Sequence, residues 1–134
     1  MKLENIKSKL LPPFDNVGIG HAVRYGEWLF ISGQIPIDKD GNIVGKNDVK
    51  LQTIQVYEII QGMLNELGYS LENIIKLTTF YVNSDDFPII AEVRKSYFNK
   101  GHLASSSAFC VNALAHSEAL VEVEAIAILT KVGK

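Results

Sequence analysis

Residues 121–129 read VEVEAIAIL, a stretch in which two kinds of side chain alternate. Side chains in a β-strand point to opposite faces in turn, so the stretch predicts a strand whose odd-numbered residues share one apolar face. Glu122 and Glu124 share the opposite face with two isoleucines, so that face changes character along its length. An ionised carboxylate is costly to bury without a partner. At least one of these glutamates is therefore expected to meet water or a cation.

The length and composition predict one globular domain. The chain has 134 residues, of which 47% are hydrophobic and 21% are charged, and it shows no repeat and no linker. We therefore expect a single domain over residues 1–134, with residues 1–11 as an N-terminal extension. The first residues, MKLENIKSKLLPPF, contain no apolar run, so no membrane partner is expected and a cytoplasmic location is predicted.

Charge and cysteine content limit the partners that the chain is expected to have. The net charge is −2 and the 13 Lys and Arg residues are scattered, so a small-molecule ligand is favoured over nucleic acid. Cys110 is the single cysteine, which excludes an internal disulfide, and its apolar neighbours predict an inert core thiol. The three histidines lie far apart in sequence without ligand spacing, so no metal site is predicted.

Hydrophobic spacing predicts the order of the elements along the chain. HAVRYG and WLFISGQIPI read as two strands of a hairpin joined at Gly26-Glu27. Helical spacing runs over about 48–67, with Asn47 or Asp48 as the cap and Gly68 as the stop. A strand is predicted over 74–82, a second helix from the cluster at 84–86 to about Asn99, and two closing strands over about 106–114 and 119–129.

The order β-β-α-β-α-β-β predicts an α+β fold with both helices packed on one face of a mixed sheet. The strands in WLFIS and IIKLTTFYV are apolar on both sides, yet two helices can cover only one face. Large exposed apolar patches are uncommon on monomers, and burial contributes about 25 cal/mol per Å². We therefore predict a homo-oligomer in which bare sheet faces pack together. A carboxylate at the edge of that interface would line a cleft between subunits.

Three groups of polar residues are candidates for a functional site, and each has two interpretations. Glu122 and Glu124 form an acid and base pair, or one is exposed while the other pairs with a lysine. Residues 32–34, Ser-Gly-Gln, let a backbone approach a ligand closely, or they form a bulge that leads to Pro36. The three serines at 105–107 offer hydroxyl groups to a ligand, or they form an ordinary polar start to a strand.

Three blocks of the sequence resemble a known family. GHAVRYGEWLFISGQIP, IIKLTTFYVNSDDF and ALVEVEAIAIL are similar to the RidA family, the YjgF-like reactive intermediate deaminases that are also called L-PSP endoribonucleases. The resemblance extends from about residue 12 to residue 131. It implies a chorismate-mutase-like, YjgF-like fold. It also implies a homotrimer whose sheets line a central barrel, with three clefts between subunits.

The resemblance also implies an activity and a set of site residues. Active members hydrolyse enamines and imines to keto acids and ammonia without a cofactor. Ser32 and Gly33 match the family's Ser-Gly pair, and Glu122 matches the glutamate that is credited with placing or activating water. The arginine that binds the substrate carboxylate is replaced by Ser106 or Ser107, and Ile19 stands where a tyrosine is expected.

Loss of the arginine leaves two functions open. A bond to a charged group contributes roughly 1.5–3 kcal/mol, so loss of a bidentate clamp is expected to cost on the order of a hundredfold in transition-state binding. The first function is a divergent hydrolase similar to a 2-iminobutanoate/2-iminopropanoate deaminase, which uses Glu122 and water. The second is a non-enzymatic ligand-binding or regulatory trimer. Ribonuclease activity is the least supported, because no basic groove is visible in the sequence.

Overall fold

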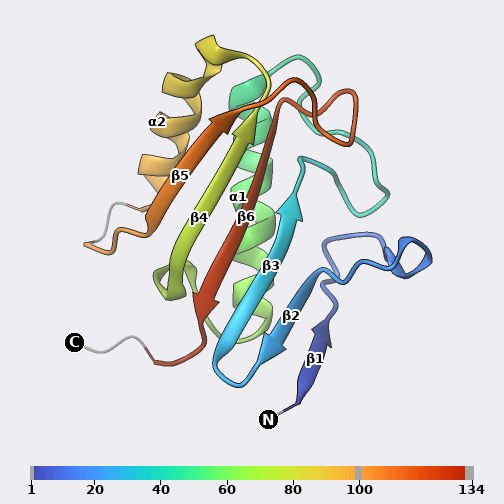
Figure 1. Ribbon diagram of the computed structural model, residues 1–134, viewed down its shortest axis with the longest axis vertical. Coiled ribbons are helices and arrows are strands. Elements are labelled where there is room, and N and C mark those ends of the chain that lie inside the picture. The colour runs from blue at the N-terminus through green and yellow to red at the C-terminus, as the bar shows by residue number, and fades with distance from the viewer. Residues whose placement is uncertain (1, 99–100, 132–134) are drawn as a thin grey trace.

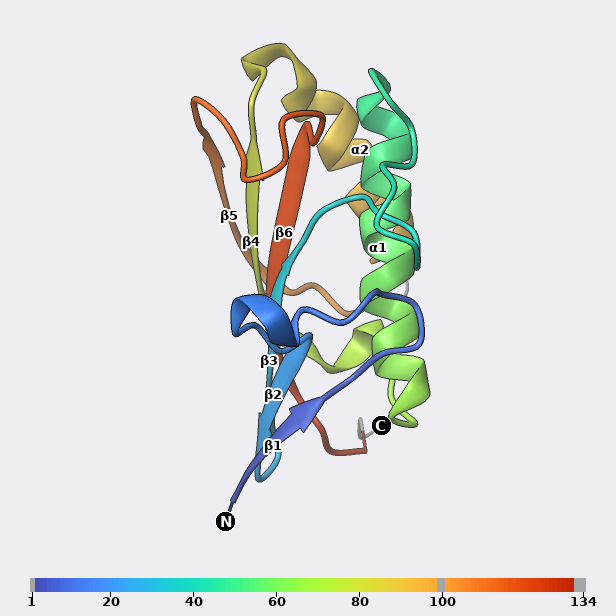
Figure 2. The same cartoon turned by 90° about the vertical axis from the view of Figure 1, so that its right-hand side faces the viewer.

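One mixed sheet with two helices on a single face makes up the fold (Figures 1 and 2). The computed structural model describes residues 2–98 and 101–131. The six strands lie in the order β1-β2-β3-β6-β4-β5, and β4 and β5 form the parallel pair. The strands are β1 Leu3–Ile6, β2 Ala22–Tyr25, β3 Trp28–Gln34, β4 Ile74–Tyr81, β5 Ser105–Cys110 and β6 Val121–Ile128. The helices are α1 Val49–Glu66 and α2 Phe87–Tyr97, with 3-10 turns η1 Asp15–Val17, η2 Leu71–Asn73 and η3 Ser84–Asp86. This arrangement confirms the predicted α+β fold.

Local sequence signals set several of these boundaries. The β2–β3 hairpin turns at Gly26, whose φ of 62° lies in the left-handed region that glycine tolerates. Of the two predicted caps for α1, Asp48 is the one used, and its carboxylate accepts a hydrogen bond of 3.1 Å from the N–H of Leu51. Gly68 follows the end of α1 with a φ of 85°, as the predicted stop requires.

The structure corrects three expectations. Residues 3–6, assigned to an N-terminal extension, form β1 and pair with β2. Strand β5 ends at Cys110 instead of residue 114, because the chain leaves β4 after one more backbone bond from Val111 N–H to Tyr81 O, 2.8 Å long. Cys110 is exposed at the edge of the sheet and is not a core thiol. Helix α2 is described to Tyr97, and its predicted end at Asn99 lies outside the described residues.

The core lies between the sheet and the helices, and β6 follows the predicted alternation. Val121, Val123 and Ala127 are completely buried on the side that faces the helices. The other side of the sheet, which we call the open face, is covered by no described helix (Figure 2). On that side Trp28 and Phe30 are 45% and 47% exposed. Strand register places the following residues on the open face: Tyr25, Trp28, Phe30, Lys76, Thr78, Phe80, Ser107, Phe109, Glu122, Glu124, Ile126 and Ile128.

The side-chain amide of Gln52 connects α1 by hydrogen bonds to the loops at one end of the sheet. The side chain is fully buried, and its Nε2 donates to the carbonyl oxygens of Gly45 and Glu118 at 3.1 and 3.0 Å. Its Oε1 accepts from the N–H of Leu120 at 2.7 Å. One fully buried amide therefore bonds to three backbone groups of half-buried loop residues, and its own polar atoms are satisfied in return.

We expect Gln52→Leu to lower the free energy of unfolding by at least about 1.5 kcal/mol, because it removes three hydrogen bonds and each contributes about 0.5–1.5 kcal/mol. Urea unfolding at one fixed protein concentration measures the change. The matched control is Gln61→Leu in the same helix, whose side chain bonds to no described residue, and its expected effect is below about 0.5 kcal/mol. Equal losses in the two variants would contradict this role for Gln52.

Candidate functional site

Glu122 lies directly against the backbone of Gly33. Between Ile31 and Gln34 the pairing of β3 with β6 shifts, so β3 carries one extra residue there as a bulge. A methyl group built on Gly33 would overlap Oε2 of Glu122 and lie 3.0 Å from its Cδ. Only glycine leaves room for the carboxylate at this position. Of the two interpretations of residues 32–34, the bulge is confirmed, while approach of a ligand to this backbone stays a prediction; within the chain, the group that lies against Gly33 is Glu122.

Ser32 is held by three hydrogen bonds within its own chain. Its hydroxyl donates to the carbonyl oxygen of Gly20 at 2.7 Å, and its N–H donates to that of His21 at 3.1 Å. Its carbonyl oxygen accepts from Nε2 of Gln34 at 2.9 Å. The hydroxyl proton is therefore committed, and toward a ligand Ser32 offers oxygen lone pairs. These bonds also fix residues 18–21 beside the bulge.

Ile19 lies in the segment that Ser32 fixes, but its side chain is separate from Glu122. The residue is 51% exposed. It lines a cavity of about 290 Å³ together with Phe14, Asp15 and His21. The structure thus connects Ile19 to the site through the backbone of residue 20 and the hydroxyl of Ser32, and not through a shared cavity with Glu122.

The two serines at the family's arginine position face opposite sides of the sheet. Ser106 is in register with Leu77, which is buried toward the helices, so it faces the helix side. Ser107 is in register with Thr78 on the open face. Its hydroxyl accepts a hydrogen bond of 2.9 Å from Nζ of Lys76. The structure therefore brings Ser107, and not Ser106, to the face that carries Glu122.

The positive charge on the open face comes from a lysine. The six strands contain two basic residues, and register places Arg24 beside the buried Leu29 and Lys76 on the open face. Arg94 is in α2, where it lines a cavity of about 340 Å³ on the helix side. Lys76 forms no ion pair with a described residue, and it lines a pocket of about 190 Å³ together with Glu124. Sequence reasoning missed Lys76, although its place in an alternating strand was a signal.

The carboxyl group of Glu122 holds its proton more tightly than an ordinary glutamate. Burial raises the pKa of Glu122, and the negative charge of Glu124 on the same strand face raises it further. A carboxyl group with a raised pKa is suited to take a proton from water and to return it, which is general acid and base chemistry.

Other kinds of site find less support in the described residues. Within residues 2–98 and 101–131, no three His, Cys, Asp or Glu side chains gather as they would to hold a metal ion. Over the same ranges no helix is long and apolar enough to cross a membrane.

Comparison with known proteins identifies the family. The family model described as endoribonuclease L-PSP matches residues 18–129. The chain belongs to this family. A RutC family protein of Pyrococcus horikoshii is 45% identical over 107 residues, which are 79% of this chain and 82% of the relative. The mouse 2-iminobutanoate/2-iminopropanoate deaminase is 30% identical over 107 residues, or 80% of this chain and 78% of the enzyme.

Solved structures confirm the RidA-like, YjgF-like fold. The conserved Rid family protein YyfA of Yersinia pestis matches with a TM-score of 0.88 and 32% identity, covering 95% of this chain and 99% of the other. TdcF of E. coli, solved with bound serine, matches with a TM-score of 0.80 and 30% identity. The match covers 93% of this chain and 98% of TdcF. These matches confirm the family that the three sequence blocks resemble.

We expect the substitution Gly33→Ala to destabilise the protein by about 0.5–1.5 kcal/mol, because the new methyl group forces the Glu122 side chain out of its rotamer. In a Glu122→Ala background the same change is expected to cost much less. The difference between the costs of Gly33→Ala in the wild type and in Glu122→Ala is the coupling energy of a double-mutant cycle, and urea unfolding measures it. The control is Gly20→Ala, whose methyl group would meet its nearest atom at an ordinary 3.4 Å. A coupling energy near zero would place Glu122 away from Gly33.

The raised pKa of Glu122 predicts a pH-dependent effect of Glu122→Gln. An acid whose pKa is higher in the folded state destabilises that state once it ionises. The cost is absent below the pKa of the unfolded chain, grows as pH rises, and is complete above the folded pKa. Glu122→Gln is therefore expected to be more stable than the wild type at neutral pH and equally stable in acid. Unfolding curves recorded from acidic to neutral pH measure the difference in stability between Glu122→Gln and the wild type. Glu92→Gln on α2 is the control. A difference that is constant with pH would disprove the shift.

Proposed function

We propose that the protein is a divergent member of the family that hydrolyses reactive enamines and imines to keto compounds and ammonia without a cofactor. The observation that carries this proposal is the Glu122 carboxylate, which lies on the bare backbone of Gly33 with a raised pKa. It occupies the open face, which none of the described helices covers. Similarity to the mouse deaminase supports the reaction class.

The proposed site lies in a cleft between the copies of a homotrimer, and the aromatic residues of the open face support that assembly. On one side of β6, Trp28 stacks on Phe30 with ring centroids 6.2 Å apart. On the other side, Phe80 stacks on Phe109 at 6.0 Å. Because the two apolar patches differ, one patch of a copy can pack on the other patch of the next copy. Such head-to-tail packing forms a closed ring when repeated rotation from copy to copy returns to the first copy. Burial of these patches between copies would place the glutamates of β6 near a neighbouring chain.

In the proposed reaction the substrate is an imine, formed directly or from its enamine tautomer. Glu122 accepts a proton from water while the water oxygen bonds to the imine carbon, and it returns that proton to the imine nitrogen. In the resulting carbinolamine, Glu122 moves the hydroxyl proton to the amino nitrogen, the carbon–nitrogen bond breaks to release ammonia, and the hydroxyl oxygen becomes the keto oxygen. Ser32 contributes lone pairs that accept from a substrate N–H. Atoms balance as imine plus water giving keto compound plus ammonia.

The charges of the open face suggest how this member differs from others. Lys76 supplies a compact point charge beside Ser107, where the family pattern has a guanidinium fork. A lysine cannot hold a carboxylate in the planar, two-bonded geometry of arginine. We therefore propose that the site selects weakly for a substrate carboxylate and accepts a less charged imine.

A second candidate function is binding of a small molecule without catalysis, in a regulatory trimer that keeps the cleft. No arginine of the six strands lies on the open face, which favours this function, and so does the committed hydroxyl proton of Ser32. Ribonuclease action has the least support, since the net charge is −2 and no basic groove is formed by the strands. We propose that either function is carried out in the cytoplasm.

The test generates 2-aminoacrylate in situ with a pyridoxal-phosphate lyase and follows pyruvate release with and without the protein. We expect acceleration by the wild type, and a loss of about a hundredfold or more in Glu122→Gln, because general base catalysis contributes about 10²–10⁴-fold. Glu92→Gln on α2 is the control and should retain the rate. Absence of acceleration by the wild type would reject hydrolysis of this substrate and favour the binding function.

Two arginine variants make the assay specific for the site. Ser107→Arg places a guanidinium on the face of Glu122 and is expected to raise the rate about tenfold to a hundredfold, since a charged hydrogen bond contributes roughly 1.5–3 kcal/mol. Ser106→Arg faces the helices and should leave the rate unchanged. A larger gain from Ser106→Arg would show that this strand presents its other face to the substrate.

A further inference from the structure

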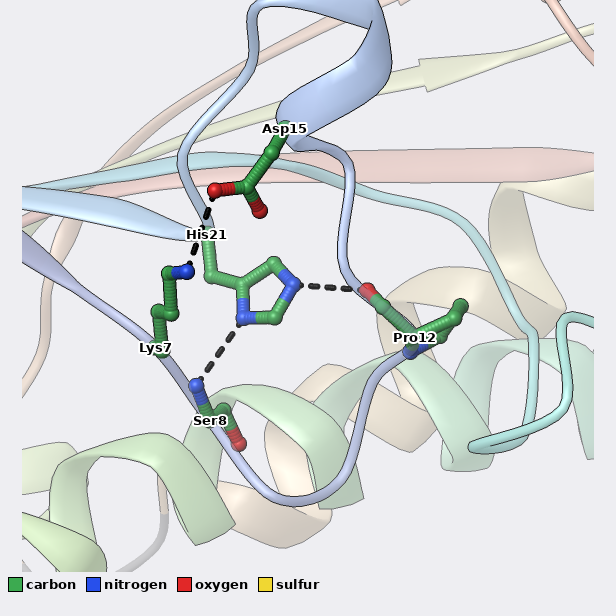
Figure 3. Close-up of polar contacts among 5 residues, drawn as sticks. All are labelled: Lys7, Ser8, Pro12, Asp15 and His21. Carbon is green, nitrogen blue, oxygen red and sulfur yellow. Dashed lines mark hydrogen bonds and ion pairs between the residues drawn. The ribbon is translucent and has the colours of Figure 1, made fainter.

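The ring of His21 is buried and bonds to the two ends of one turn of the chain, at Ser8 and Pro12 (Figure 3). Only 5% of the residue is exposed. Nδ1 accepts from the N–H of Ser8 at 2.9 Å, and Nε2 contacts the carbonyl oxygen of Pro12 at 2.8 Å. A backbone N–H can only donate and a carbonyl oxygen can only accept. Both bonds therefore require a neutral ring with its proton on Nε2.

These bonds hold residues 7–12, which we call the N-terminal arm, against the rest of the fold. The N–H of Lys9 donates to the Glu66 carboxylate of α1 at 3.1 Å. The side chain of Leu10 lies on Gly62 of the same helix, where a methyl group would collide with its Cδ1. Leu11 is buried in the core. The arm thus packs along α1, and the ring of His21 joins its two ends.

The same histidine connects the arm to the bulge of β3. Its carbonyl oxygen accepts the N–H of Ser32, and the carbonyl oxygen of Gly20 accepts the hydroxyl of Ser32. The ring bonds the arm while the main chain of the same residue bonds the strand that carries Gly33. A change at the ring can therefore be transmitted to residues 18–21 through a single residue.

Protonation of this ring is incompatible with the docked arm. A second proton goes to Nδ1 and converts the acceptor into a donor that faces the N–H of Ser8, so that the bond is lost. The charged groups beside the ring are Lys7 of the arm and Asp15 of η1, which pair with each other at 3.0 Å. On α1, Glu66 bonds to the N–H of Lys9 in the same arm. Asp15 attracts a cationic ring and Lys7 repels it, but neither charge restores the lost bond to the N–H of Ser8.

We propose that His21 is a pH-sensitive latch and a positioning residue. In neutral solution its ring holds the arm on α1 and fixes residues 18–21 beside Ser32. In mildly acidic solution the ring gains a proton, the arm is released, and residues 18–21 loosen. This inference does not rest on the proposed hydrolysis, and its test involves no substrate.

The test follows the full-length, isotope-labelled protein by NMR at about pH 8 and about pH 5.5, on either side of the ordinary titration range of imidazole. At the higher pH the ring signals of His21 should show a protonated Nε2 and a bare Nδ1. The arm amides should have order parameters near about 0.85, falling below about 0.6 at the lower pH. Asp15 stays ionised across this range, because its hydrogen bond to Lys7 and the Lys7 charge lower its pKa.

His21→Gln keeps one donor and one acceptor but cannot titrate, so its arm should be equally ordered at both pH values. The matched control is His116→Gln in the loop before β6, whose Nδ1 accepts from the N–H of Glu118, and it should respond as the wild type does. The latch is overturned if the wild-type arm stays ordered while the ring protonates, or if the ring does not titrate over this range. It is also overturned if His21→Gln loosens in acid as the wild type does.

Discussion

The constraint on which the rest of the structure depends is that two helices cover one side of a six-stranded sheet. The chain buries its apolar side chains between the helices and the odd-numbered residues of β6. The opposite side keeps large aromatic residues such as Trp28, Phe30 and Phe109, each about half exposed. Burial of such area contributes about 25 cal/mol per Å², so a neighbouring copy is the occupant that best explains these residues. The glutamates of β6 lie in the middle of this side.

The position of Glu122 follows from the same constraint. On a fully covered sheet a carboxylate in the middle strand would be costly, while on the open face it keeps access to solvent. The bulge of β3 brings Gly33 beneath it, and the missing side chain leaves room for the carboxylate. Partial burial and the neighbouring Glu124 then raise the pKa of Glu122. The contact between Glu122 and Gly33 and the raised pKa of Glu122 therefore both depend on how the adjacent strands β3 and β6 pair.

Periodicity was sufficient to predict both helices, five of the six strands and the two faces of β6, because these depend on neighbours in sequence. Contacts between distant strands were not predictable in this way. Nothing in the local sequence shows that Gly33 lies under Glu122, or that Lys76 reaches Ser107. Which of Ser106 and Ser107 lies on the face of Glu122 depended on the register of β5 against β4.

Other differences have local physical reasons. Strand β1 was missed because its residues, LENI, do not alternate clearly, and the strand is stabilised by pairing with β2. The exposed position of Cys110 depends on its strand being at the edge of the sheet, which apolar neighbours in sequence cannot reveal. The ring of His21 has no motif around it, and its role follows from the path of the arm.

The most direct test of this account is the mass of the protein in solution, measured by sedimentation equilibrium at several concentrations. The chain mass is 14.8 kDa, and the account predicts a particle of three times that mass, because in the proposed homotrimer further copies cover the open face. A particle that remains at the mass of one chain across the concentration range would contradict it.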